Sequence, residues 1–272
     1  TDAVVTGFNG VVSNASASSS GYGFFSDTAL NTDVWISGIE FKNLFRGVNV
    51  YRFAGLHIDN CVGQDLLSSI WGAGLVTNRS TGFYAAGNLA INCGKFVPGA
   101  ENDIGFVSYC DTVRTRDNLS INGGRSENIN QGHALYFRSC TDVESRSDGG
   151  KNHLGGSFIH VSAEASDAAC ADVDIIGARA DGCPDYYAIR CTKVNSLRVI
   201  GGRLARAGIN GAYISNANDV TIDGTRIIDA NRKGSSGAAL NAALFLETVD
   251  DYKVRNVSMY ARVKSGATYG MG

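Results

Sequence analysis

The stretch NDVTIDGTRIIDAN, residues 218–231, contains the pattern that decides the fold. Apolar Val220 and Ile222 alternate with polar residues, Gly224 follows, and an apolar residue returns at Ile227. Strict alternation is typical of a β-strand with one buried face. The single glycine leaves no room for a hairpin loop. It therefore predicts a sharp turn in which one residue adopts the left-handed conformation, which glycine, asparagine and aspartate tolerate best.

The same pattern recurs throughout the chain. With Val220 taken as position zero, nine copies align, at spacings of 22, 27, 30, 30, 30, 24, 23 and 32 residues. The turn position, four residues later, holds glycine, asparagine, aspartate or serine in every copy. Repeats of 20–50 residues indicate a stacked, solenoid architecture. The position-zero residues are Val34, Leu56, Phe83, Val113, Val143, Val173, Leu197, Val220 and Tyr252.

Each copy holds two further strand-length segments. One follows the turn, and another lies upstream, with apolar residues at positions minus eight and minus six and an inward residue at minus three. Three short strands per repeat predict an all-β, right-handed parallel β-helix of about nine coils. A β-sandwich of short strands is the alternative, but it does not explain a turn residue that is fixed in nine copies. We expect residues 1–30 to form an N-terminal capping segment and 31–262 the β-helix. Residues 263–272 are expected to be a tail that continues into, or is cut from, a longer protein.

Composition excludes several classes of protein. The chain of 272 residues carries a net charge of −2, which gives no overall field to attract nucleic acid. No run approaches eighteen apolar residues, so no membrane span is predicted.

The seven cysteines follow no pattern of pairs. Cys110, Cys140 and Cys170 occupy the same inward position, thirty residues apart, and are expected to be buried thiols that act as small hydrophobic side chains. An odd count argues against a disulfide scaffold, and no zinc-ligand spacing is present. With no signal segment visible, the thiols predict assembly in the bacterial cytoplasm and a later location outside the cell or on a virion surface.

Over about residues 30–260 this repeat resembles the pectin-lyase-like β-helix superfamily, in particular phage tailspikes that depolymerise polysaccharide. Asn31-Thr32-Asp33 and Gly132-His133 match fragments of polygalacturonase motifs, although the paired aspartates that accompany them there are missing. The resemblance implies a polysaccharide partner and, for a tailspike, a homotrimer. It also implies a substrate that lies along the upstream strand. A non-catalytic glycan-binding rod and a secreted uronate lyase or epimerase are the alternatives.

Outward positions on that upstream strand supply the first candidate site. Arginine can hold a uronate carboxylate with its two-pronged guanidinium, while histidine and tyrosine can exchange protons near neutral pH. Together these groups suit β-elimination, which we favour slightly over hydrolysis. An ordinary solvated flank is the alternative interpretation. The candidate catalytic residues are His133, Tyr136, Arg138, His160 and Arg190, and Tyr51, Phe106, Tyr187 and Tyr213 are expected to bind substrate.

A second candidate lies at position plus one, where Glu144 and Asp174 fall on neighbouring coils, as a glycosidase acid and nucleophile would. A ladder of salt bridges is the favoured interpretation of this column, because alternating charges stabilise a sheet. Arg114, Arg116 and Arg146 would add positive charge beside it for substrate binding. No cofactor is predicted; Ca²⁺ is possible, although no ligand cluster can be assembled from the sequence.

Overall fold

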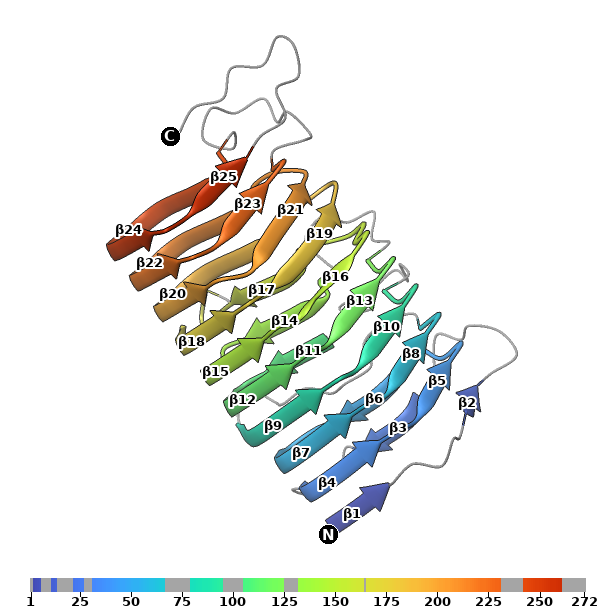
Figure 1. Ribbon diagram of the computed structural model, residues 1–272. Helices are drawn as coiled ribbons and strands as arrows, with labels where there is room; N and C mark the ends of the chain where they lie inside the picture. The colour runs from blue at the N-terminus through green and yellow to red at the C-terminus, as the bar shows by residue number, and fades with distance from the viewer. Residues whose placement is uncertain are drawn as a thin grey trace.

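The computed structural model describes residues 2–5, 11–13, 22–26, 31–66, 79–94, 105–124, 132–163, 165–230 and 242–260. These ranges hold only strands, turns and irregular segments, and no helix in them is long and apolar enough to cross a membrane. Successive coils stack into a rod, with the first strand at one end and the last at the other (Figure 1). All strand pairs among the described residues are parallel, so the predicted parallel β-solenoid with three strands per coil is confirmed.

Sheet 1 contains the aligned repeat. Its strands pair position-zero residues with one another in unbroken register from Val34 to Tyr252, as the sequence predicted. Eight of the nine are buried, and Tyr252 in the last coil is exposed. In stacking order the strands are β1 (Asp2–Val5), β4 (Asn31–Ser37), β7 (Phe53–Asp59), β9 (Ser80–Ala86), β12 (Cys110–Arg116), β15 (Thr141–Arg146), β18 (Cys170–Ile176), β20 (Ile189–Ile200), β22 (Ala212–Asp223) and β24 (Leu244–Arg255).

Sheet 2 follows the predicted turn. It stacks ten three- to five-residue strands, which in order are β2 (Val11–Ser13), β5 (Glu40–Lys42), β8 (Val62–Gln64), β10 (Leu89–Ile91), β13 (Leu119–Ile121), β16 (Gly149–Lys151), β19 (Arg179–Cys183), β21 (Arg203–Ala207), β23 (Arg226–Ile228) and β25 (Ser258–Tyr260).

The third face is built from the upstream strands. Near the N-terminus β3 (Tyr22–Ser26) pairs with β6 (Arg46–Val50). Further along, β11 (Gly105–Ser108), β14 (Leu135–Arg138) and β17 (Ile159–Ser162) pair in turn and join the first residues of β20. In β20, β22 and β24 the strands of the third face and sheet 1 merge into single twelve-residue strands. The region expected to cap the rod, residues 1–30, thus contributes β1, β2 and β3 to the three faces. Residues 261–272 lie outside the described ranges.

Left-handed residues turn the chain at each corner. At the predicted turn position all nine residues have positive φ, between 53° and 68°: Gly38, Asn60, Gly87, Asp117, Ser147, Gly177, Gly201, Gly224 and Asn256. The residue immediately before position zero is also left-handed in every copy, which the sequence interpretation missed: Asp33, Gly55, Gly82, Thr112, Asp142, Asp172, Ser196, Asp219 and Asp251. Because aspartate and glycine fill seven of these nine positions, the sequence did contain the signal.

The interior confirms the prediction for the cysteines. All seven are buried and free. Burial raises the pKa of Cys110 to about 12 and that of Cys170 to about 11, and it raises the pKa of Cys140, which lies between them in the stack, well above its ordinary value. At neutral pH these groups are thiols, and they fill the core as small apolar side chains.

A polar ladder inside the core was not predicted. Asn88, Asn118 and Asp148 occupy the first inward position after the turn on successive coils. The backbone N–H of Asn88 donates to Asn118 Oδ1 at 3.1 Å, and the backbone N–H and side-chain amide of Asn118 donate to Asp148 Oδ1 at 2.8 and 2.9 Å. Buried hydroxyls of Thr115 and Ser145 donate to Asp148 Oδ2 at 2.5 and 2.7 Å. Four donors therefore satisfy a carboxyl group that lies wholly out of water.

Removing this carboxyl group should weaken the fold. Asp148→Ala leaves all four donors without an acceptor, so the free energy of unfolding should fall by about 3 kcal/mol or more, whereas Asp148→Asn should cost about 1 kcal/mol. Urea denaturation of both variants measures this, with the exposed turn residue Asp117→Asn as control. A loss in Asp148→Ala no larger than in the control would contradict the role of the ladder.

The pH dependence gives a second readout. Burial raises the pKa of Asp148, and the hydrogen bonds from Thr115, Ser145 and Asn118 oppose that shift. Because the pKa of Asp148 is higher in the folded protein, the folded protein binds more protons than the unfolded chain between the raised pKa and the ordinary value near 3.8. The wild-type protein should therefore gain stability relative to Asp148→Asn over that interval. A constant difference between the two unfolding free energies from pH 7 to pH 4 would contradict it.

Candidate functional site

The third face brings the main group of predicted residues together in one row. Direct strand pairing places Tyr136 next to His160, and His160 next to Arg190. The row extends to Phe106 on one side and to Tyr213 and Phe245 on the other. The register confirms the predicted positions, including that of His160, which required an insertion after it.

Two of the predicted histidines form a buried pair. His160 Nδ1 lies 2.7 Å from His133 Nε2, and the backbone N–H of Ser157 donates to His133 Nδ1 at 2.8 Å. Since that Nδ1 accepts, the proton of a neutral His133 ring is on Nε2, from which it is donated to His160 Nδ1. His160 then carries its proton on Nε2, which is buried and has no hydrogen-bond partner in the described part of the chain. The pair thus presents one unused N–H donor.

The environment keeps His160 uncharged. Burial lowers its pKa well below 6.5, and the neighbouring His133 and Arg190 lower it further. The expectation that this histidine exchanges protons near neutral pH is therefore not supported by its surroundings, because burial removes the charged form. A third histidine, His153, is also buried: its Nε2 contacts the carbonyl of Gly132, its ring packs on Phe158, and burial lowers its pKa to about 4.

Aromatic rings hold the guanidinium of Arg190 beside this pair. Its Nη1 donates to the hydroxyl of Tyr186 at 2.6 Å, and its Cζ lies 5.6 and 5.8 Å from the ring centroids of Tyr186 and Tyr187. Arg190 Nε has no partner among the described residues. Tyr186 was not among the residues predicted, although it precedes Tyr187 directly, because an alternating strand pattern assigns adjacent residues to opposite faces.

Tyr136 completes the cluster. Its ring stacks on His160, with centroids 4.6 Å apart and planes at 8°, and its hydroxyl lies 2.8 Å from Ser162 Oγ. Unlike the two histidines it is only partly buried. On the far side of Arg190, Tyr187 stacks on Tyr213 and Tyr213 on Phe245, with centroids 5.0 and 5.8 Å apart.

The predicted Arg138 takes part in a different contact. Its Nη2 lies 3.4 Å from Asp167 Oδ2, which also accepts from the hydroxyl of Tyr109 at 2.7 Å. The hydrogen bond from Tyr109 is the largest cause of a lowered pKa at Asp167, while burial and Asp167 raise the pKa of Tyr109 to about 12. Asp167 belongs to the segment after β17, which is outside the repeat, so the repeat could not predict that Asp167 lies at this face. The contact ties that segment to the third face beside the histidine cluster.

Tyr51 lies apart from the cluster. It is near the N-terminal end of the third face, where Arg46 Nη1 donates to its hydroxyl at 3.5 Å and the ring of Phe25 lies 6.4 Å away.

The second candidate is a ladder of ion pairs. Glu144 and Asp174 are direct neighbours in sheet 1, as predicted, but each carboxylate already has an arginine. Arg146 Nε lies 3.2 Å from Glu144, and Arg198 Nε donates to Asp174 at 2.5 Å. Arg114 pairs with the left-handed Asp142 at 2.7 Å, and the exposed Arg116 lies 3.6 Å from Asp117. A groove of about 410 Å³ is lined by Arg114, Asp142, Val143, Glu144, Asp172, Asp174, Ser196 and Arg198. This arrangement is the one that the salt-bridge interpretation expects.

No metal site accompanies either candidate in the described ranges, where no group of three or more histidine, cysteine or acidic side chains is placed to hold an ion.

The protonation of His160 can be checked directly. In ¹H–¹³C NMR spectra of histidine-labelled protein, the His160 ring signal, assigned through His160→Gln, should not shift between pH 8 and pH 6, because its pKa is lowered well below 6.5. The more accessible His57, whose pKa burial also lowers, provides the comparison within the same sample. A midpoint for His160 at or above 6.5 would contradict the neutral, donating form.

Comparison with solved structures finds a protein of similar architecture. The A-module of the mannuronan C-5 epimerase AlgE4 from Azotobacter vinelandii aligns with 88% of this chain and 76% of its own chain, at a TM-score of 0.33 and 8% sequence identity. No protein-family model and no curated protein matches the sequence. The assignment of a parallel β-solenoid therefore rests on the strand pairing of this chain itself.

Proposed function

We propose that this chain is a carbohydrate-active β-solenoid that binds an acidic polysaccharide across the third face and cleaves it by β-elimination. The observation that carries the proposal is the unused His160 Nε2–H, buried beside the guanidinium of Arg190. A buried donor without an acceptor costs stability and is uncommon in a purely structural position. A ligand oxygen would satisfy it.

A carboxylate fits the two donors. His160 offers one N–H, and Arg190, its neighbour in the strand register, offers a second from Nε, which has no partner among the described residues. Charge-assisted bonds from arginine to a carboxylate are among the strongest hydrogen bonds in proteins. Since the pKa of His160 is depressed, the ring acts as a neutral donor and not as a second cation. The partly buried rings of Tyr136, Tyr213 and Phe245 would contact the sugars that flank the bound uronate, whereas Phe106 and Tyr187 are buried behind them.

β-Elimination uses this arrangement as follows. Arg190 and His160 would bind the C6 carboxylate of a uronate and stabilise the negative charge that develops on it when the C5 proton leaves. A base takes the C5 proton, the bond from C4 to the glycosidic oxygen breaks, and that oxygen takes a proton, which leaves a C4=C5 double bond. Tyr136 is the group that we propose for proton exchange, because its hydroxyl is bonded to Ser162 and its ring is held on His160. His160 itself is not the base, since His133 occupies its second nitrogen.

Two other activities remain as candidates. A non-catalytic glycan-binding rod is favoured by the aromatic ladder of the third face, which needs no chemistry to hold sugars. Hydrolysis through Glu144 and Asp174 is less favoured, because each of these carboxylates is engaged by an arginine.

A viral fibre is the proposed setting. The seven buried thiols suit assembly in a reducing cytoplasm before exposure outside the cell, and we propose a homotrimer of the tailspike type. A secreted, monomeric uronate lyase or epimerase is the competing proposal, and sedimentation of the active species distinguishes trimer from monomer.

The test is an incubation with capsule, O-antigen, alginate and pectin polysaccharides, in which chain length and the absorbance of unsaturated uronate are followed together. Shortening with new absorbance is expected of the wild type. His160→Gln and Arg190→Gln should each reduce the rate by about 10²–10³-fold, as removal of one transition-state donor does. Lys253→Gln, at an exposed position of sheet 1, is the control and should change the rate by less than about twofold, since surface substitutions remote from the site have small effects.

The other outcomes overturn the proposal in separate ways. Shortening without new absorbance, abolished by Glu144→Gln, indicates hydrolysis at the second candidate. Binding of a polymer that is never shortened indicates a binding rod.

A further inference from the structure

Sheet 2 carries a strip of arginines on its outward face, away from the third face. Arg179 of β19 pairs in direct register with Arg203 of β21, and Arg203 with Arg226 of β23. All three are exposed. Like charges directly opposite one another on adjacent strands destabilise a sheet, so the arrangement has no structural benefit of its own.

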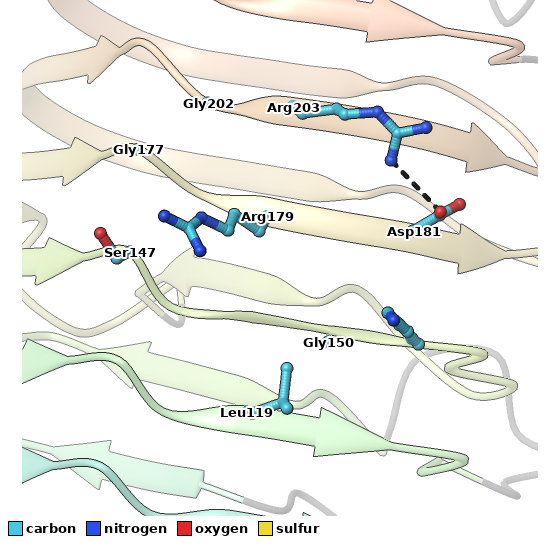
Figure 2. Close-up of a pocket in the computed structure, with 9 residues that line it drawn as sticks. Leu119, Ser147, Gly150, Gly177, Arg179, Asp181, Gly202 and Arg203 are labelled. Carbon is cyan, nitrogen blue, oxygen red and sulfur yellow. Dashed lines mark hydrogen bonds and ion pairs between the residues drawn. The ribbon is translucent and has the colours of Figure 1, made fainter.

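The strip is not neutralised, in contrast to the arginines of sheet 1. Arg203 Nη1 lies 3.2 Å from Asp181 Oδ2, but the same carboxylate also receives Arg206 Nε at 2.5 Å. Arg179 has no acidic partner among the described residues, and Figure 2 shows its guanidinium directed toward Ser147 and away from Asp181. Arg226 lies over the ring of Tyr260.

The charged residues on and beside this strip carry a net positive charge. Lys151, Arg179, Arg203, Arg206 and Arg226 contribute five positive charges, and Asp181 and Asp229 contribute two negative ones, which leaves +3. The whole chain has a net charge of −2, so positive charge is concentrated on this face.

A groove lies along the strip. It is drawn in Figure 2, has a volume of about 600 Å³ and is lined by Leu119, Ser147, Gly150, Lys151, Gly177, Arg179, Asp181, Gly202 and Arg203. Three of these nine lining residues are glycines.

We propose that this strip is a second binding site, for a linear acidic glycan that lies along the stacking direction. Neighbouring arginines are about 4.8 Å apart at the backbone, so a chain with a carboxylate on each sugar can meet them one after another. Among the described residues none of those that line the groove is aromatic, which disfavours single-stranded nucleic acid there, because its bases need rings to stack on. The choice of a glycan as the polyanion rests on the proposed function, whereas the requirement for an anion follows from the charges alone.

The experiment measures binding of an octameric oligogalacturonate, its methyl ester and an octaglutamate by calorimetry at low salt. Arg179→Gln/Arg203→Gln should bind the oligogalacturonate about tenfold more weakly or worse, because hydrogen bonds between charged groups contribute more than one order of magnitude in affinity. The salt dependence should become flatter. Lys253→Gln/Arg255→Gln removes the same charge from exposed positions of sheet 1 and should change the affinity by less than about twofold.

Equal affinities for the two double variants would overturn the site, and equal affinity of the wild type for octaglutamate would overturn the assignment to a glycan. Neither outcome depends on catalysis. Loss of cleavage in His160→Gln with binding to the strip intact supports both proposals, and binding to the strip without any cleavage by the wild type removes only the proposed lyase activity.

Discussion

Every coil depends on residues in the left-handed backbone conformation, which most amino acids avoid. One left-handed residue follows each strand of sheet 1 and another precedes its central position, in nine copies each. Further left-handed residues follow sheet 2, among them Asn92, Asn122 and Asn152. Together these residues set the path of each coil, and the strands of neighbouring coils pair in matching register. With this register comes the stacking of like residues: Cys110, Cys140 and Cys170 in one interior column, Tyr136, His160 and Arg190 in one exterior row. A single backbone requirement thus places both the core and the candidate site.

This dependence explains what the sequence could predict. Periodicity is a property of the backbone path, and it predicted the strand register, the nine left-handed turns, the buried thiols and the row on the third face. It also indicated that Glu144 and Asp174 are neighbours and that salt bridges are the better interpretation of their column. Each of these predictions needs only the position of a residue within the repeat.

What the sequence did not predict depends on contacts outside the repeat. Asp167 lies in a segment of irregular length after β17, and only the fold shows that it reaches Tyr109 and Arg138. Tyr186 follows a turn, so the alternation of inward and outward residues that placed its neighbour Tyr187 does not apply to it. The protonation of His160 is set by a chain of hydrogen bonds that begins at the backbone of Ser157. Burial then lowers the pKa of His160, so this histidine is a neutral hydrogen-bond donor, whereas the sequence predicted that it would exchange protons near neutral pH.

The polar ladder in the core also has a direction. Asn88 and Asn118 each offer both an acceptor and donors, so amides can follow one another without limit, but the carboxyl group of Asp148 accepts only. The next coil places Ala178 at the equivalent position. If an ancestral gene had lengthened the rod by copying the coil that contains Asp148, two carboxyl groups would lie about 4.8 Å apart in the core and compete for one set of donors. An asparagine coil can therefore be repeated with its hydrogen bonds intact, whereas repeating the coil of Asp148 would require one of the two carboxyl groups to be protonated.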